Sequence, residues 1–243
     1  MTQVHIGTSG WTYDGWRGPF YPAELPKKDW LSWYAEQFSS TEINGSFYRT
    51  PSLEAVAAWH EQTPEDFVFA WKASKFITHW KRLSEKSVNS IELMETRLKK
   101  LRRKIGPVLF QLPARFKADR ERLASFLKLL PKRYRYAFEF RDKSWYDDSL
   151  LEVLGNRNVA LCISDHVDAP APWQVTADFV YVRGHGPTGE YHSRYPQQTL
   201  TEWHRIIGKW RRQRIDIYCY FDNDQKSAAP KDARLLQQMV TTK

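Results

Sequence analysis

The sequence predicts a single-domain TIM barrel, the (β/α)8 fold. Short apolar runs rich in Val, Ile, Phe and Tyr recur eight times in the 243 residues, and each stops on a polar or charged residue. Stretches long enough for a helix separate most runs, and about 30 residues per unit is typical of a βα repeat. The runs end near Thr8, Asn44, Lys72, Gln111, Arg141, Asp165, Arg183 and Asp222. Because the carboxyl ends of all eight barrel strands surround one mouth, this pattern also predicts where a site lies.

The first four units follow from apolar runs, prolines and helical stripes. Strands are expected at residues 4–7, 41–44, 67–72 and 107–111. Helices are expected at 29–38, from Pro51 onward, at 84–105 and at 120–130. Proline suits a helix start, since its missing N–H needs no partner there, and the apolar residues of the longest helix approximate one stripe. Segments 8–22 and 73–83 are expected as loops.

The last four units are read in the same way. Strands are expected at residues 136–141, 159–164, 179–183 and 215–221, and helices at 146–155, 200–212 and 231–240. The proline-containing segment 165–178 leaves little room for a full helix, so a reduced helix is expected between strands six and seven. Alternating strands and helices favour parallel pairing. The rival, an open doubly wound sheet, lacks its Gly-rich phosphate signatures here.

Composition indicates a soluble, cytoplasmic protein. A hydrophobic fraction of 42% with 15% aromatic residues suits a continuous core. The chain starts directly on a strand-like segment, and no apolar stretch approaches the ~18 residues of a membrane span, so neither a signal peptide nor a membrane association is expected. Cys162 and Cys219 fall in buried strands, which indicates reduced thiols.

The net charge of +9 is concentrated in three runs before strands, at residues 99–104, 132–135 and 209–214. Cations at helix carboxyl ends complement the helix dipole, and these ends face away from the mouth. A solvated, dipole-matched face is therefore favoured over a nucleic-acid footprint.

Several motifs in order resemble the domain of unknown function 72, or YecE-like, family over nearly the whole chain. They are Gly7-Thr-Ser-Gly-Trp11 with Phe20-Tyr-Pro, Glu42-Ile-Asn-Gly-Ser-Phe-Tyr48, Lys72 with Thr78-His79, Phe110-Gln-Leu-Pro113, Phe138-Glu-Phe-Arg141 with Ser144-Trp145, and Tyr181-Val-Arg-Gly-His-Gly186. The resemblance implies a TIM-type barrel and an intracellular setting, with no established activity. The last strand departs from the family pattern, since Asp222 stands where Asn is usual before Asn223.

Charged residues alternate with aromatic ones on the fifth strand. Glu139 and Arg141 share one face, and Phe138 and Phe140 share the other. If the Phe face meets the helices, the charged pair points into the barrel, where a carboxylate must be paired or functional. A catalytic Glu139 and a structural ion pair to Lys72 or Arg183 both remain open.

Glu42 and Asn44 share a face of the second strand, which makes Glu42 a second candidate carboxylate. Two carboxylates facing one substrate is the arrangement of glycosidases. Five aromatic residues are candidates for ligand stacking, namely Trp11, Trp16, Tyr48, Trp80 and Trp145. Core packing is the alternative for most of them.

Cations also end several strands. The group comprises Lys72, Arg141, Arg183 and His185, with Lys75 and His79 nearby. Guanidinium and ammonium donors converging on one mouth suit phosphate or carboxylate, so an anionic ligand is favoured over mutual neutralisation with Glu42, Glu139 and Asp165.

A metal, another cofactor and a nucleophile motif are not expected. Of seven histidines, only His79, His166 and His185 lie near mouth loops. A minor alternative remains in which one divalent ion is bound by Asp165, His166, His185 and Glu139. Neither Ser9 nor the cysteines have the neighbours of a nucleophile.

Together these residues predict a mouth that binds a small phosphate-bearing anion or nucleic-acid fragment, with hydrolase- or lyase-type acid/base chemistry. Catalysis is assigned to Glu139, Glu42, Asp165 and His185. Ligand binding is assigned to Lys72, Arg141, Arg183, Trp11, Asn44, Tyr48, His79 and Asn223. The alternatives are a non-catalytic protein that binds single-stranded nucleic acid, and a glycosidase.

Overall fold

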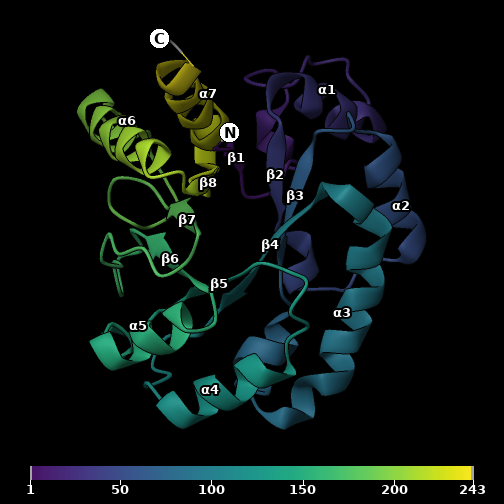
Figure 1. Ribbon diagram of the computed structural model, residues 1–243. Coiled ribbons are helices and arrows are strands. Elements are labelled where there is room, and N and C mark those ends of the chain that lie inside the picture. The colour runs from purple at the N-terminus through teal and green to yellow at the C-terminus, as the bar shows by residue number, and fades with distance from the viewer. Residues whose placement is uncertain (1, 242–243) are drawn as a thin grey trace.

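Eight parallel strands form the barrel in the computed structural model, which describes residues 2–241 (Figure 1). The strands are β1 (Val4–Thr8), β2 (Ser40–Ile43), β3 (Val68–Lys72), β4 (Ile105–Gln111), β5 (Tyr136–Glu139), β6 (Ala160–Ser164), β7 (Phe179–Gly184) and β8 (Asp216–Phe221). The helices around them are α1 (Trp30–Gln37), α2 (Leu53–Glu61), α3 (Val88–Leu101), α4 (Arg120–Leu129), α5 (Asp148–Gly155), α6 (Gln197–Arg212) and α7 (Ala228–Thr241). The predicted fold class is confirmed.

The sheet runs in the order β1-β8-β7-β6-β5-β4-β3-β2, so β1 and β2 meet at the seam. Pairing at this seam is sparse. Ser9 and Glu42 form an isolated parallel bridge, the Gly10 N–H donates to the Glu42 carbonyl at 2.8 Å, and the Thr41 hydroxyl donates to the Thr8 carbonyl at 3.0 Å. These contacts bring the first strand's carboxyl end, and with it Ser9, beside Glu42.

Gly7 lets the two seam strands approach closely. A Cβ at this position would lie 2.0 Å from the Ser40 carbonyl oxygen and 2.9 Å from the Tyr34 hydroxyl. No real Cβ tolerates a backbone atom at that separation. The glycine is therefore required by the spacing of β1 and β2.

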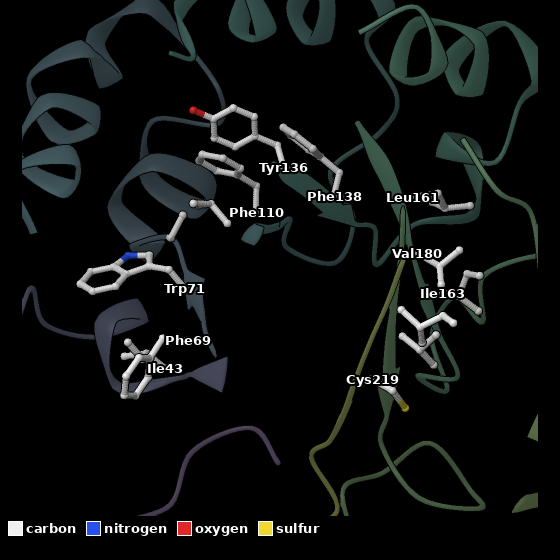
Figure 2. Packing of buried hydrophobic residues seen from close by; sticks show 14 of the residues in the cluster. Ile43, Phe69, Trp71, Phe110, Tyr136, Phe138, Leu161, Ile163, Val180 and Cys219 are labelled. Atoms are coloured by element: carbon white, nitrogen blue, oxygen red, sulfur yellow. The ribbon is translucent and has the colours of Figure 1, made fainter. Parts of the chain in front are cut away.

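Buried apolar side chains divide into two layers. Alternate residues on each strand point either into the barrel or toward the helices. The interior layer comprises Ala70, Leu109, Ala137, Ala160, Cys162, Phe179, Tyr181, Tyr218 and Tyr220. The larger outer layer packs under the helices, and Figure 2 shows part of it, including Trp71, Phe110 and Phe138. Both cysteines are buried free thiols, Cys162 in the interior layer and Cys219 in the outer one.

Two helical expectations differ from the structure. The segment 73–83, expected as a loop, contains a π-helical turn at Phe76–Trp80. The helix expected at 84–105 is α-helical only over Val88–Leu101, flanked by 3₁₀ turns. Arg102 adopts a φ of +52°, which is incompatible with continuing the α-helix, and β4 begins three residues later at Ile105.

The segment between β6 and β7 is irregular throughout, so the reduction expected there is complete (Figure 1). Ala171 N–H donates to the Ser164 carbonyl at 2.7 Å and keeps the segment against β6. Trp173 stacks on Trp210 of α6, with ring centroids 5.8 Å apart and planes inclined by 27°. One indole thus occupies part of the space where a helix usually lies.

No helix in the part of the chain from residue 2 to 241 combines the length and apolarity that crossing a membrane requires.

Candidate functional site at the barrel mouth

Ionisable side chains gather above the interior layer, where the strands end. Those with an exposed fraction of 6% or less are Glu42, Lys72, Glu139, Arg141, Arg183, His185 and Asp222. The alternation on β5 explains two of them, because Phe138 and Phe140 lie in the outer layer while Glu139 and Arg141 face the other way. The sequence candidates therefore converge on one buried, mixed-charge cluster.

Arg183 is the centre of this cluster. Its Nη2 lies 2.9 Å from Glu42 Oε1, 2.8 Å from Asp222 Oδ2 and 3.0 Å from Ser9 Oγ. Its Nη1 lies 2.8 Å from Glu139 Oε2. A guanidinium has a fixed planar fork of donors, so one side chain can hold three carboxylates from three strands. Its Nε has no partner among residues 2–241, but none of the Arg183 surface is exposed, so a ligand has little access to it.

Glu42 is held by further donors. The Ser9 hydroxyl donates to Oε1 in a short hydrogen bond, and the Tyr181 hydroxyl donates to Oε2 at 2.7 Å. Ser9 lies at the seam, and Tyr181 lies on β7 two residues before Arg183, so both reach Glu42 because the barrel closes. A carboxylate with this many fixed partners orients its neighbours and is poorly placed to exchange protons.

Glu139 contacts two guanidinium groups. It forms ion pairs with Arg183 and with Arg141, two residues further along the chain. Burial alone would raise the pKa of Glu139, but Arg141 and Arg183, with His185 and Lys72, outweigh it and hold that pKa well below its usual range. Such a carboxylate stays ionised at neutral pH, so of the two roles of a catalytic Glu139, general acid or general base, its surroundings do not favour the acid.

Fewer protein groups occupy the terminal nitrogens of Arg141 than those of Arg183. One terminal nitrogen, Nη2, pairs with Glu139 and lies 3.2 Å from His185 Nε2. Its Nε is buried and has no hydrogen-bond partner among residues 2–241. The Tyr191 ring centroid lies 5.8 Å from the guanidinium carbon. A buried N–H without an acceptor is costly, so a ligand oxygen here would be favourable.

Lys72 is the other cation with unused donors. Its Nζ lies 3.2 Å from Asn44 Oδ1 and 4.5 Å from the centre of the Phe47 ring. No salt bridge found within residues 2–241 includes Lys72. Burial, and then the neighbouring charge of Arg183, lowers the pKa of Lys72 to about 8.

His185 and Asp165 form a pair beside the cluster. Asp165 Oδ1 accepts from the His185 backbone N–H at 2.7 Å and lies 3.4 Å from His185 Nδ1. The Tyr195 hydroxyl donates to the other Asp165 oxygen in a short hydrogen bond. His185 is fully buried, whereas the Asp165 side chain is 32% exposed, so Asp165 is the candidate carboxylate that reaches solvent.

His79 and His166 flank the cluster as neutral rings. Burial lowers the pKa of each to about 4, with the charge of Lys72 as the next cause for His79 and that of Arg141 for His166. His79 Nδ1 lies 2.9 Å from the Thr78 hydroxyl, and its ring contacts Phe47 edge to face at 5.1 Å.

The rim carries two exposed aromatic side chains. Tyr48 and Trp80 are each 66% exposed, and Lys75 Nζ lies 5.5 Å from the Tyr48 ring and 5.7 Å from the Trp80 ring. By contrast, Trp16 and Trp145 are fully buried, so their expected role as stacking platforms is wrong. They pack in the aromatic core, Trp145 against Phe140 and Trp16 against Phe20, where no ligand reaches.

Trp11 lies beside the mouth and is only 7% exposed. Its ring packs edge to face on Trp59 at 5.4 Å. Trp11 and Asn44 line a hollow of about 340 Å³ between the first loop and α2. Asn44 therefore belongs both to this hollow and to the Lys72 contact.

Asn223 anchors the chain after β8. Its Nδ2 donates to the Ser193 carbonyl at 2.7 Å and to Asp232 Oδ2 at 2.9 Å. Both hydrogens of the Asn223 amide are therefore donated to protein acceptors, and the bond to Ser193 fixes the loop after β7.

Sequence reasoning missed Asp222, Tyr181, Tyr191 and Ser9 as members of the cluster. Asp222, noted only as a departure from the family pattern, forms an ion pair with Arg183. Tyr181 carried a signal, since strand alternation places it on the same face as Arg183. Ser9 and Tyr191 lie in loops, where no periodicity applies.

Across residues 2–241 no group of three or more His, Cys, Asp or Glu side chains is arranged to hold a metal ion. Glu139, which was considered as one metal ligand, is occupied by two guanidinium groups.

Comparison with known proteins identifies similar chains. A profile of the family described as "Protein of unknown function DUF72" matches residues 5–243. The UPF0759 protein YunF of Bacillus subtilis is 26% identical over 270 aligned residues, covering 98% of this chain and 94% of that protein. The UPF0759 protein YecE of Escherichia coli K12 is 32% identical over 158 residues, covering 64% of this chain and 55% of that protein.

Solved structures are similar over almost the full chain. A DUF72 family protein of Thermotoga maritima superposes with a TM-score of 0.89 at 26% identity, covering 99% of this chain and 100% of that one. A DUF72 family protein of Enterococcus faecalis gives a TM-score of 0.83 at 19% identity, covering 99% and 96%. At 19% identity, the similarity to the Enterococcus faecalis protein shows a shared fold.

Proposed function

The chain belongs to the DUF72 family, and we propose that the mouth of its barrel binds a phosphate-bearing anion and acts on it by acid/base chemistry of the hydrolase or lyase type. The observation that carries the proposal is an imbalance in how the buried charges are satisfied. Both terminal nitrogens of Arg183 are bound by Glu42, Glu139 and Asp222, and its Nε, which lacks an acceptor among residues 2–241, belongs to a side chain with no exposed surface. Lys72 has one acceptor for three ammonium hydrogens, and Arg141, which retains some exposed surface, has an Nε without one.

Lys72 and Arg141 divide the expected binding role. Lys72 offers an ammonium with one protein acceptor, and Arg141 offers its buried Nε. Phosphate oxygens match such donors, and charge-assisted hydrogen bonds are stronger than neutral ones. Arg183 then acts as the internal brace that positions the carboxylates.

Proton transfer is assigned to the His185 and Asp165 pair. Asp165 is partly exposed and lies next to a ring nitrogen of His185, an arrangement suited to moving a proton between solvent and the mouth. Glu42 and Glu139 are better assigned to positioning Arg183, because both are buried and held by several donors.

Binding of inorganic phosphate by calorimetry tests the proposal. Lys72→Met should weaken phosphate binding by about tenfold or more, the worth of one charge-assisted hydrogen bond. Lys99→Met, which removes an exposed lysine near the carboxyl end of α3, is the matched control and should bind as the parent does. Equal affinity in the two variants, or no phosphate binding by the parent, would reject the anion site.

A second candidate, the binding of single-stranded nucleic acid without catalysis, is favoured by the rim. Tyr48 and Trp80 present exposed rings on either side of Lys75, which is the combination of stacking surface and phosphate contact used for single strands. Oligonucleotide affinity should then fall when Tyr48→Ala and Trp80→Ala are combined, and should fall with rising salt. Affinity for an oligothymidine that is unaffected by salt would exclude this candidate.

The glycosidase alternative finds less support. Such enzymes need a protonated carboxyl group opposite a second carboxylate, with the sugar between them. Here the Arg183 guanidinium bridges Glu42 and Glu139 and occupies the intervening space. The lowered pKa of Glu139 also opposes a proton-donating role.

A further inference from the structure

Two buried lysines in this barrel are satisfied very differently. Lys104, just before β4, donates from Nζ to the His60 carbonyl at 2.6 Å, to the Thr63 carbonyl at 2.7 Å and to the Thr63 hydroxyl at 3.3 Å. Its exposed fraction is 2%. All three ammonium hydrogens thus have acceptors at the carboxyl end of α2, which is the pattern of a structural lysine.

Lys72 is as buried as Lys104, with an exposed fraction of 5%, but has one acceptor, Asn44 Oδ1. Two potential hydrogen-bond donors of its ammonium are therefore left over. Among residues 2–241 no carboxylate lies within salt-bridge distance of Nζ, and Glu42, Glu139 and Asp222 pair with Arg183 and Arg141. The fold thus holds an amine at the mouth without the partners that would fix it as an ammonium.

The neighbours of Lys72 favour the uncharged amine. The Phe47 ring covers one side of Nζ at 4.5 Å and is a cation–π partner for the ammonium, so the shift toward the amine comes from burial and from Arg183. Burial, with the Arg183 charge, brings the pKa of Lys72 down to about 8, so an appreciable share of the amine is free at pH 7.5. Desolvation and an adjacent cation are the two usual means of activating a lysine as a nucleophile.

We propose that Lys72 is an imine-forming residue and that the substrate of this mouth carries an aldehyde or ketone as well as a phosphate. The inference rests on the proposed function for the phosphate and adds the carbonyl. Free phosphate would contact both the Lys72 ammonium and Arg141, whereas in a substrate that carries a carbonyl the phosphate would lie on Arg141, with its unpartnered Nε, and the carbonyl carbon on Lys72.

The covalent step balances without any oxidant or metal. The neutral Nζ attacks the carbonyl carbon and the C=O π electrons move to oxygen, giving a carbinolamine after proton transfer from nitrogen to oxygen. Loss of the remaining nitrogen proton and of hydroxide, together one water, forms the C=N bond. Protonation of that nitrogen gives an iminium, which withdraws electrons and makes a neighbouring C–H or C–C bond easier to break.

Reductive trapping with glyceraldehyde 3-phosphate tests the proposal. Cyanoborohydride supplies the hydride that reduces the iminium to a stable secondary amine, and peptide mass spectrometry locates it. At pH 7.5 Lys72 should be modified at least about tenfold faster than partly exposed Lys75, because a lower pKa gives more free amine. Lys104 should remain unmodified. Equal rates at Lys72 and Lys75, or no adduct at Lys72, would overturn the proposal.

Two further arms separate this proposal from the proposed function. Lys72→Arg, which keeps the positive charge, should lose only the adduct at position 72, with an unchanged circular dichroism spectrum and adducts elsewhere retained. Phosphate binding by the parent without an adduct at Lys72 overturns the imine and leaves the anion site standing. An adduct at Lys72 formed equally fast with unphosphorylated glyceraldehyde supports the imine and argues against a phosphate subsite.

Discussion

Replacing the central guanidinium tests the physical account of the site most directly. In Arg183→Met, three buried carboxylates, those of Glu42, Glu139 and Asp222, lose their shared partner. Methionine fills much of the same volume, so the main change is electrostatic. We expect a large loss of stability, since breaking a buried ion pair from one side leaves uncompensated charge in the interior.

The magnitude follows from burial. Removing one partner of a buried ion pair costs about 3–5 kcal/mol. For a chain of this length each kcal/mol lowers the Tm by about 2–4 °C, so a decrease of roughly 6–20 °C is expected. Arg135→Met is the matched control, because Arg135 pairs with Asp216 at 2.8 Å while 35% of its side chain is exposed. Its cost should be below about 1 kcal/mol.

Urea unfolding of both variants at pH 7.5 and pH 5 provides the assay. Since the folded pKa of Glu139 is lowered, its contribution to parental stability is present above the ordinary carboxyl pKa and is lost as pH falls through the folded value. Without Arg183 one of the groups that lower the Glu139 pKa is gone and Glu139 protonates more easily, so the deficit of Arg183→Met should shrink from pH 7.5 to pH 5. The reasoning is refuted if, at pH 7.5, Arg183→Met loses an unfolding free energy within about 0.5 kcal/mol of the loss in Arg135→Met, because substitutions at the surface change stability by that amount.

Three other outcomes are expected. Gly7→Ala should lower the urea midpoint of unfolding much more than Gly15→Ala does. A Cβ at position 7 would lie 2.0 Å from the Ser40 carbonyl oxygen, whereas a Cβ at position 15 has nothing within 4 Å. Equal midpoints in the two variants would contradict the close approach of β1 and β2. Lys104→Met should destabilise by about 1–3 kcal/mol in the same assay, because it leaves buried acceptors unpaired, and an unchanged midpoint would be inconsistent with that account. Phosphate binding, measured by calorimetry from pH 6.5 to 9.5, should weaken as pH rises through the Lys72 pKa of about 8, and constant affinity would mean that its charge does not contribute.

Strand periodicity predicted the architecture and the direction of several side chains. On β5 the alternation of Phe138 and Phe140 with Glu139 and Arg141 was enough to place the charged pair inside the mouth. It works because a two-residue period fixes side-chain direction locally, without knowledge of the partners. The same rule identifies Tyr181 from its spacing to Arg183.

Partner choice within the cluster could not be predicted in this way. Glu42 and Arg183 lie on strands far apart in sequence, and only closure of the barrel places them 2.9 Å apart. Which donors of each cation find an acceptor depends on distances of a few tenths of an ångström. The sequence therefore predicted the same ligand-binding role for Lys72 and Arg183, although Arg183 pairs with three carboxylates and Lys72 contacts one neutral acceptor.

Aromatic residues were assigned less well than charged ones. Trp16 and Trp145 lie outside the predicted strands, in sequence that gives no periodicity from which burial can be inferred, and both lie in the core. Tyr48 and Trp80 also lie outside the predicted strands and are exposed. The difference arises from packing between segments distant in the chain.

The strand order of the barrel bears on how the chain is synthesised. β1 pairs along its whole length with β8, from Val4 opposite Ile217 to Thr8 opposite Phe221, whereas it meets β2 mainly through one bridge. On the ribosome the first strand therefore emerges long before its principal partner exists. Seven strands can assemble as an open, curved sheet. The mouth cannot take its final shape until β8 leaves the exit tunnel, because both the β1–β8 pairing and Asp222, the residue directly after β8, become available only then.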